Sequence, residues 1–350
     1  MSVFAHPEFD HHEAVVYCHD ARSGLRGIIA VHDTHLGKAL GGCRMWPYPG
    51  EAEALTDVLR LARGMTYKAA LADLPQGGGK SVIIGDPRAD KTPDLIRAMG
   101  RAIDRLGGVY VVAEDSGTSV QDMRLMAEVT SHVGGLADAA AQAAGRTGDP
   151  SPATAFGVFV GIQAAVRFQL GREDLSGVRV AVQGLGNVGY RLCRHLSEAG
   201  ARLWVTDLYA PAVERCVRQF NATAVGMDQI AALDVDVYAP CALGAVLNDR
   251  TIPQIRARVV AGAANNQLSE PRHDRALQER GILYAPDYCI NAGGIIDIYY
   301  EGPDYDAAVV DRHLRRIGTT LTAIFERARD QGRPTGEIAD RMAEERFRPS

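Results

Sequence analysis

Apolar residues in the first part of the chain follow two different spacings. Helical spacing begins at Glu51 and at Pro93, and it predicts amphipathic helices that end near Lys68 and Leu106. Short apolar runs rich in β-branched residues predict strands at 13–18, 25–32 and 109–113. Strands that alternate with helices are typical of an α/β domain.

A glycine-rich stretch interrupts this pattern. Lys68 and Lys80 lie on either side of Pro75 and the glycine triplet 77–79, and the apolar run 82–84 follows as a predicted buried strand. Glycine has no side chain to pack and a large entropy cost in regular structure. The triplet therefore indicates a break at which the backbone approaches another group closely.

The two lysines suggest acid–base chemistry. If they converge on one small cleft, their mutual repulsion pushes the pKa of one of them toward 7, where an amine can both donate and accept a proton. The alternative is that both are solvated surface lysines beside a loop. The segment 36–42, which closes with a glycine pair, is predicted to be a further loop.

Acidic residues follow the strand predicted at 109–113. Glu114 and Asp115 stand at its carboxyl end, and in open α/β sheets that end is where ligands bind. Asp115 is therefore a candidate site residue.

The second half of the chain carries a dinucleotide-binding pattern. A helix is predicted at 154–168 and a strand at 178–183, which runs into the sequence GLGNVG and a helix to residue 199. A second strand ends in Asp207, 18 residues after the last glycine. The glycines would let a pyrophosphate approach backbone N–H groups at a helix N-terminus, and Asp207 would bind ribose hydroxyls and repel a 2′-phosphate. The pattern predicts NAD rather than NADP.

Further apolar runs continue the alternation. Strands are predicted at 235–241, 259–266 and 282–285, and two asparagines, Asn265 and Asn266, end the second of them. Residues 291–298 are predicted to open one long last helix, and a charged helix over 335–347 closes the chain. Small and loose residues over 134–152 place a domain boundary or hinge at about 145–152.

Composition narrows the class of protein. The chain has 350 residues, of which 46% are hydrophobic and 23% charged, with a net charge of -5, so neither nucleic acid nor a membrane surface is an expected partner. The six cysteines are scattered, and no cysteine or histidine spacing suits a metal, so no metal is expected. No signal peptide and no run of about 18 apolar residues is evident, which favours a cytoplasmic soluble protein.

The motifs together resemble the glutamate/leucine/phenylalanine/valine dehydrogenases over residues 10–345. The resemblance is carried by TYKAA, QGGGKSVIIGDP, VVAEDSGT, VQGLGNVG, YAPCALGAVLND, VAGAANNQLSEPRH and YAPDYCINAGGII. It implies two α/β domains with a cleft between them. Residues 1–149 would bind substrate and form the oligomer, 150–330 would form a Rossmann doubly wound parallel sheet that binds NAD, and 331–350 would pack back on the first domain.

The resemblance also implies roles for individual residues. Lys80 would polarise the carbonyl and activate water, Asp115 would shuttle protons to the amino group, and Lys68 would hold the substrate carboxylate. The remaining substrate contacts would come from Leu40, Gly41, Gly42, Met65, Ala113, Asn266, Ile295 and Ile298. The cofactor contacts would come from Thr154, Gly184, Leu185, Gly186, Asn187, Val188, Gly189, Asp207, Cys241, Ala242, Ala263 and Asn265.

The expected pocket lining decides among substrates. Glutamate-specific members carry lysine where this chain has Leu40, and their serine position corresponds to Ile298. A lining of Leu40, Ala113, Ile295 and Ile298 would leave a glutamate carboxylate buried without a partner, which is prohibitive. Leucine, isoleucine and valine fit. Phenylalanine stays open as an alternative, because one methylene changes discrimination by only about 1–3 kcal/mol.

A second class of function is an NAD-binding protein that senses amino acids without catalysis. Such a protein would keep the glycine motif but would not need Lys80 and Asp115. The resemblance favours the enzyme and implies a homo-octamer. Cys43 and Cys289, beside the glycine pair and the NAGG sequence, are either packed thiols or oxidation-sensitive positions.

Overall fold

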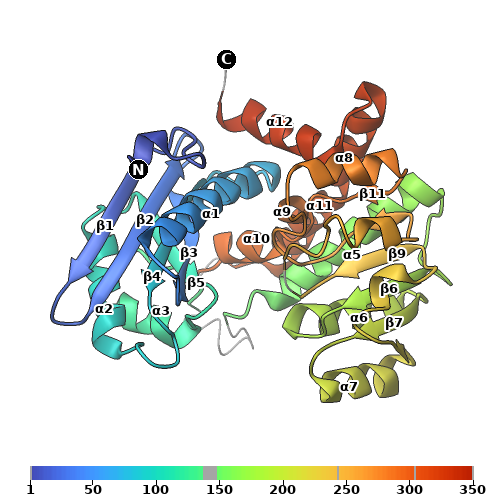
Figure 1. Ribbon diagram of the computed structural model, residues 1–350, viewed down its shortest axis with the longest axis horizontal. Helices are drawn as coiled ribbons and strands as arrows, with labels where there is room; N and C mark the ends of the chain where they lie inside the picture. The colour runs from blue at the N-terminus through green and yellow to red at the C-terminus, as the bar shows by residue number, and fades with distance from the viewer. Residues whose placement is uncertain (1, 137–147, 243, 303–304, 349–350) are drawn as a thin grey trace. The chain divides into compact units, whose positions relative to one another are not determined.

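The computed structural model describes residues 2–136, 148–242, 244–302 and 305–348, which divide into two compact units (Figure 1). The first unit consists of Met1–Asp149, Ile298–Tyr305 and Ala343–Ser350, and the second of Pro150–Asp297 and Asp306–Met342. The hinge predicted at about 145–152 lies partly outside the described residues.

The first unit contains a five-stranded mixed sheet of order β1-β2-β4-β3-β5. β2 pairs antiparallel with both β1 and β4, whereas β3 pairs parallel with β4 and β5. The strands are β1 (Ala14–Asp20), β2 (Leu25–Asp33), β3 (Ala39–Trp46), β4 (Gly77–Ile84) and β5 (Tyr110–Glu114).

Helices cover both faces of this sheet. α1 buries its apolar stripe, which includes Leu55, Val58 and Leu59, against Ile28 and Val82 on one face. The opposite face packs against residues 95–103 of the second helix of this unit and Met123 and Met126 of the third (Figure 1). The helices of this unit are η1 (Val3–Ala5), α1 (Glu51–Leu71), α2 (Pro93–Asp104) and α3 (Val120–Ala127), and Thr92 and Ser119 cap the last two.

Two glycine-rich segments predicted as breaks lie inside strands instead. Gly41 and Gly42 belong to β3, and the triplet 77–79 opens β4. A Cβ atom on Gly41 would overlap the Gly79 carbonyl oxygen, and one on Gly78 would overlap the backbone of Thr66. The close approach inferred from the glycines is therefore real, but it is an approach between neighbouring strands and a helix, so the strands are not interrupted.

The second unit contains a six-stranded parallel sheet of order β11-β10-β9-β6-β7-β8. Numbered from β6, this is the doubly wound order 3-2-1-4-5-6 read from the β8 edge, with the switch point between β6 and β9. The strands are β6 (Arg179–Gln183), β7 (Arg202–Thr206), β8 (Thr223–Ala224), β9 (Val237–Pro240), β10 (Val259–Val260) and β11 (Leu283–Tyr284).

The long last helix predicted from residue 291 is in fact two helices. α10 ends at Tyr299, Gly302 has a φ of 147°, and Asp306 caps α11 by accepting hydrogen bonds from the next turn. From Ser151 onward the helices are α5 (Ser151–Leu170), α6 (Asn187–Glu198), α7 (Ala210–Phe220), η2 (Ile230–Ala232), η3 (Ile252–Gln254), α8 (Arg272–Glu279), α9 (Asp287–Ile290), α10 (Gly293–Tyr299), α11 (Ala307–Gln331) and α12 (Thr335–Phe347).

α5 is long and apolar enough to cross a membrane by length and composition, although Gln163, Arg167 and Gln169 interrupt its apolar residues. Its apolar window is 56% buried inside the protein. Gly157 and Gly161 let it pack closely on Ile317 of α11 and on Ile290. This packing is that of a core helix.

The glycine contacts generate a paired prediction. Gly41→Ala must force β3 and β4 apart, so we expect it to destabilise the fold by at least about 3 kcal/mol and to lower Tm by roughly 6 °C or more. Gly64→Ala in α1 is the control, because its Cβ would meet open space and alanine favours a helix by about 0.5–1 kcal/mol. Thermal unfolding followed by circular dichroism measures both. An unchanged Tm in Gly41→Ala would contradict the close strand pairing.

Candidate active site

The central strands of the first unit direct their reactive side chains to one face of the sheet. Side chains two residues apart on a strand share a face, and the register pairs Leu40 with both Gly78 and Val111. The shared face, which also receives α1, is lined by Leu40, Gly42 and Arg44 of β3, by Gly78 and Lys80 of β4, and by Val111 and Ala113 of β5.

Lys80 and Asp115 meet on this face. The ammonium of Lys80 contacts Oδ2 of Asp115 as an ion pair, and Lys80 is only 4% exposed. Gly42 makes room for the carboxylate, since a Cβ atom there would lie 2.7 Å from Cβ of Asp115. The Thr118 hydroxyl accepts from the Asp115 N–H at 3.0 Å and donates to the Cys43 carbonyl at 2.8 Å, which fixes the turn after β5.

Burial lowers the pKa of Lys80 to about 7, because the charged form loses hydration. The positive charges of Arg44 and then of Lys68 act in the same direction, whereas Asp57 opposes them. The predicted repulsion between the two lysines is present, but it is the third cause, behind burial and Arg44. Near pH 7 Lys80 is therefore able to donate and to accept a proton.

Arg44 and Asp57 were missed in the sequence analysis. Arg44 donates to Oδ2 of Asp57 at 2.9 Å and to Oδ1 of Asp115 at 3.4 Å. The available signal was the alternation of β3 itself, since Arg44 lies two residues after Gly42. Predicting 36–42 as a loop hid that alternation.

Lys68 and Met65 come from the last turns of α1. This part of the helix lies directly on β4, because Gly78 has no side chain to hold Thr66 away. Lys68 is near enough to Lys80 to lower its pKa. The helix thus adds a cation to the face that already carries Lys80 and Arg44.

Aliphatic side chains gather at the other end of this face. A Cβ atom built on Gly134 would lie 3.4 Å from Ile298, 3.7 Å from Val111 and 3.8 Å from Leu40, all ordinary contact distances. Leu40 is buried and Ile298, from α10, belongs to the same unit. Sequence reasoning found Leu40 and Ile298 but missed Val111 and Gly134. Two other predicted substrate contacts, Asn266 and Ile295, belong to the second unit.

Buried thiols lie near two of these elements. Burial raises the pKa of Cys43 to about 11, so its thiol stays protonated at neutral pH. Cys289 is also buried. Both behave as packed thiols.

The glycine motif of the second unit forms the turn between β6 and α6. Gly184 has a φ of 99°, which a residue with a side chain rarely adopts. A Cβ atom on Gly189 would overlap the Gly184 carbonyl oxygen, whereas one on Gly186 would meet open space beside the start of α6. The three glycines therefore provide a tight turn, an open backbone for a pyrophosphate, and close packing of helix on strand.

The switch point brings a second loop to this motif. Ala242, which with Cys241 follows β9, would lie 2.6 Å from a Cβ atom on Gly184, so the two loops touch. Asp207 at the end of β7 accepts hydrogen bonds from the N–H groups of Leu185 at 2.6 Å and Tyr209 at 2.7 Å. It lines a cavity of about 400 Å³ between β7 and α7, with Val213, Val217 and Val225 among its apolar walls. This set of residues fits the adenosine half of NAD.

Asn291 organises the loop after β10. Its side-chain amide donates to the Ala263 carbonyl at 3.1 Å and to Oδ1 of Asn265 at 2.7 Å. Asn265 and Asn266 are exposed, and Asn266 has a φ of 51°. Thr154 near the start of α5 donates to the Pro150 carbonyl. Thr154 and Asn265, which are predicted to contact the nicotinamide and its ribose, thus both belong to the second unit.

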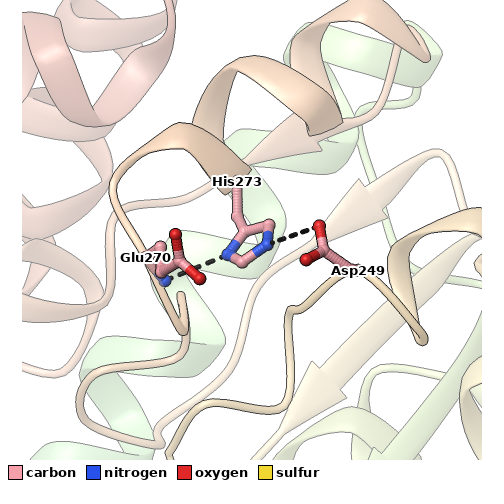
Figure 2. Close-up of side chains that lie close together, drawn as sticks. All are labelled: Asp249, Glu270 and His273. Carbon is pink, nitrogen blue, oxygen red and sulfur yellow. Dashed lines mark hydrogen bonds and ion pairs between the residues drawn. The ribbon is translucent and has the colours of Figure 1, made fainter.

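Asp249, Glu270 and His273 are residue types that bind metals and lie close together, but their ligand atoms already have protein partners. Figure 2 shows His273 between Asp249 and the backbone of Glu270. Nδ1 of His273 accepts from the Glu270 N–H at 3.0 Å, so Nε2 is left to donate to Asp249 at 3.2 Å. Arg272 pairs with both carboxylates and holds the pKa of Asp249 at about 2. The ligand atoms already have partners, and the group joins a loop to α8.

Family models, individual proteins and solved structures all include relatives of this chain. The family model for the Glu/Leu/Phe/Val dehydrogenase dimerisation domain matches residues 12–132, and the Glutamate/Leucine/Phenylalanine/Valine dehydrogenase model matches 145–207 and 209–333. The chain belongs to the Glu/Leu/Phe/Val dehydrogenase family. It is 51% identical to a leucine dehydrogenase of Geobacillus stearothermophilus over 347 residues, 99% of this chain and 94% of that protein.

Other relatives differ in their named substrate. A phenylalanine dehydrogenase of Caldalkalibacillus thermarum is 44% identical over 352 residues, 99% of this chain and 94% of that protein. The crystal structure of an L-tryptophan dehydrogenase from Nostoc punctiforme superposes with a TM-score of 0.83 at 46% identity and covers 96% of both chains. The protein is therefore an NAD-dependent L-amino-acid dehydrogenase with the two-domain fold of this family.

The unusual protonation of Lys80 is directly measurable. The chain has only four lysines, Lys38, Lys68, Lys80 and Lys91, so ¹³Cε-lysine labelling gives a countable set of NMR signals. We expect one signal, absent from Lys80→Arg, to titrate with a midpoint near 7, because burial disfavours the ammonium form. A Lys80 signal that does not titrate below pH 9 would contradict this electrostatic description.

Proposed function

We propose that the protein catalyses the reversible NAD-dependent oxidative deamination of a branched-chain L-amino acid, L-leucine with valine and isoleucine, to the 2-oxo acid and ammonia. The observation that carries the choice of substrate is the aliphatic group of Leu40, Val111 and Ile298 around Gly134, on the face that holds Lys80 and Asp115. An amino acid held at its polar end by cations would direct its side chain toward this group.

The polar end of the substrate is proposed to bind the cations. Lys68 holds the carboxylate, with help from the backbone at Gly41 and Gly42. Two positive charges on a face with little water favour an anionic group there, since charge interactions are stronger in a low dielectric. A substrate carboxylate also stabilises the protonated forms of both lysines.

Lys80 and Asp115 are proposed to carry the proton transfers. Protonated Lys80 donates a hydrogen bond to the developing carbonyl oxygen, and neutral Lys80 accepts a proton from the attacking water. Its pKa near 7 makes both forms available. Asp115 exchanges protons with the amino group, and its contact with Lys80 couples the two. Bound NAD supplies the hydride acceptor.

The cofactor is proposed to bind along the glycine motif of the second unit. Backbone N–H groups from Leu185 to Val188 lie at the N-terminus of α6, where the helix dipole favours a pyrophosphate. Asp207 would exchange its present backbone donors for ribose hydroxyls, and its charge opposes a 2′-phosphate. Thr154, Cys241, Ala242, Ala263 and Asn265 would surround the nicotinamide end.

The aliphatic lining supports leucine over its competitors. Leu40, Val111 and Ile298 offer no partner to the side-chain carboxylate of glutamate, whose burial there would be costly. Gly134 has no side chain to take up volume among these three residues, which keeps phenylalanine as the second candidate. By resemblance we also propose a homo-octamer in the cytoplasm, with residues 1–149 forming the oligomer contacts.

A substrate panel tests this function. We expect kcat/KM with NAD, measured as NADH formation at 340 nm, to be at least about tenfold higher for L-leucine and L-valine than for L-phenylalanine or L-tryptophan, the discrimination that a few methylenes supply. L-glutamate should be lowest. If L-phenylalanine leads, the family assignment stands and the reading of the aliphatic pocket is wrong.

Substitution of Lys80 separates the enzyme from a sensor in the same assay. We expect Lys80→Ala to lose about 100-fold or more in kcat, the range of general acid–base catalysis, while its NADH affinity is unchanged. Lys38→Ala, which removes an exposed lysine of the same unit, is the matched control and should keep full activity. NAD binding without turnover in the unsubstituted protein would favour the sensor.

A further inference from the structure

Arg44 lies on the same face of the sheet as Lys80 and reaches two carboxylates at once. One nitrogen of its guanidinium donates to Asp57 at 2.9 Å and the other donates to Oδ1 of Asp115 at 3.4 Å. Its Nε is buried and has no hydrogen-bond partner among the described residues. The hydrogen bonds that orient the guanidinium are therefore those of its two terminal nitrogens.

Asp57 and Tyr48 hold Arg44 from the side of α1. The Tyr48 hydroxyl donates to Oδ2 of Asp57 at 2.5 Å, the same oxygen that accepts from Arg44. Burial, followed by this contact, raises the pKa of Tyr48 and keeps the hydroxyl protonated. Asp57 thus accepts from both Tyr48 and Arg44, and Arg44 would lose its hydrogen bonds to Asp57 and Asp115 if it turned away.

The two oxygens of Asp115 have different surroundings. Oδ1 accepts from Arg44 and from the N–H of Ser116 at 2.5 Å, whereas Oδ2 contacts Lys80. With Oδ1 bound by two donors, the plane of the carboxylate is set. Oδ2 is the oxygen that remains beside the lysine.

We propose that Arg44, supported by Asp57 and Tyr48, is a positioning residue that fixes Oδ1 of Asp115 and so presents Oδ2 to Lys80 and to the substrate amino group. The inference rests on the proposed roles of Lys80 and Asp115. It adds a second contribution of Arg44, its charge, which acts on Lys80 across the face.

The charge and the geometry of Arg44 have separable effects. Lys80 is faced by Arg44 of β3, by Lys68 and Asp57 of α1, and by Asp115 after β5. The Cys43 thiol lies on the opposite face of the sheet and acts on Lys80 only through its charge. A nearby cation disfavours the ammonium form, so removing the charge of Arg44 raises the pKa of Lys80. The acid limb of the pH profile of kcat/KM, which follows loss of the Lys80 proton, must then move to higher pH.

Two substitutions distinguish these effects. Arg44→Gln removes both the positive charge and the planar guanidinium that reaches the two carboxylates. We expect kcat to fall by about 10- to 100-fold and the acid limb of the pH profile to move to higher pH by about 0.5 unit or more. Arg44→Lys keeps the charge but cannot reach Asp57 and Asp115 together. Its kcat should fall similarly while its acid limb stays in place. KM for L-leucine should change less than about threefold in both.

The controls address folding and the charge change itself. Arg60→Gln removes an exposed arginine of α1 that pairs with Glu8, and it should leave kcat and the pH profile unchanged. Thermal unfolding and NADH binding report whether each variant is folded. If Arg44→Gln does not fold, Tyr48→Phe carries the test, since it removes only the donor to Asp57, and a lower kcat at unchanged KM supports the proposal.

Other outcomes would overturn the proposal. An Arg44→Gln enzyme within twofold of the unsubstituted kcat, with an unmoved acid limb, shows that Arg44 neither positions Asp115 nor acts on Lys80. If Arg44→Gln does not fold, a folded Tyr48→Phe enzyme with unchanged kcat overturns the proposal in its place. Full activity in Lys80→Ala, assayed in parallel, would instead remove the proposed function on which the inference rests.

Discussion

The burial of one lysine among other charges is the constraint on which the first unit depends. Lys80 is 4% exposed, and an ammonium group so placed is stable only if it is paired or loses its proton. The protein does both: Asp115 contacts the amine, while burial, Arg44 and Lys68 lower its pKa to about 7. A surface lysine would need none of these neighbours. They come from β3, from the turn after β5 and from α1, so several elements of the unit converge on this one amine.

Glycine makes this arrangement possible. Gly41 lets β3 approach the Gly79 carbonyl of β4, and Gly42 leaves space for Asp115. Gly78 lets α1 lie on the sheet so that Lys68 approaches Lys80. On the opposite face, Tyr110 donates to the Gly41 carbonyl at 2.7 Å and holds β3 in place. The flexibility that these glycines give the unfolded chain is a cost of bringing charges so close.

Sequence patterns predicted much of the secondary structure and the second sheet, and the predictions that failed have a physical cause. Hydrophobic spacing located most helices and strands, and the glycine motif with its acid after β7 predicted a doubly wound sheet that the strand order confirms. Local reasoning assigned the residues 36–42 and the triplet 77–79 to loops, because glycine disfavours strands, and tertiary pairing reversed that preference. Arg44 was missed for the same reason, since the face it shares with Lys80 exists only when β3 is continuous.

The specific roles of the site residues rest on one arrangement: an amino acid lying on the face of the first sheet. A crystal structure of the non-reactive complex with NADH and L-leucine tests it most directly. We expect the leucine carboxylate on Nζ of Lys68, the amino nitrogen within hydrogen-bond distance of Asp115, and the isobutyl group against Leu40, Val111 and Ile298. A leucine bound with its side chain toward the lysines, or bound away from Lys80 and Asp115, would contradict it.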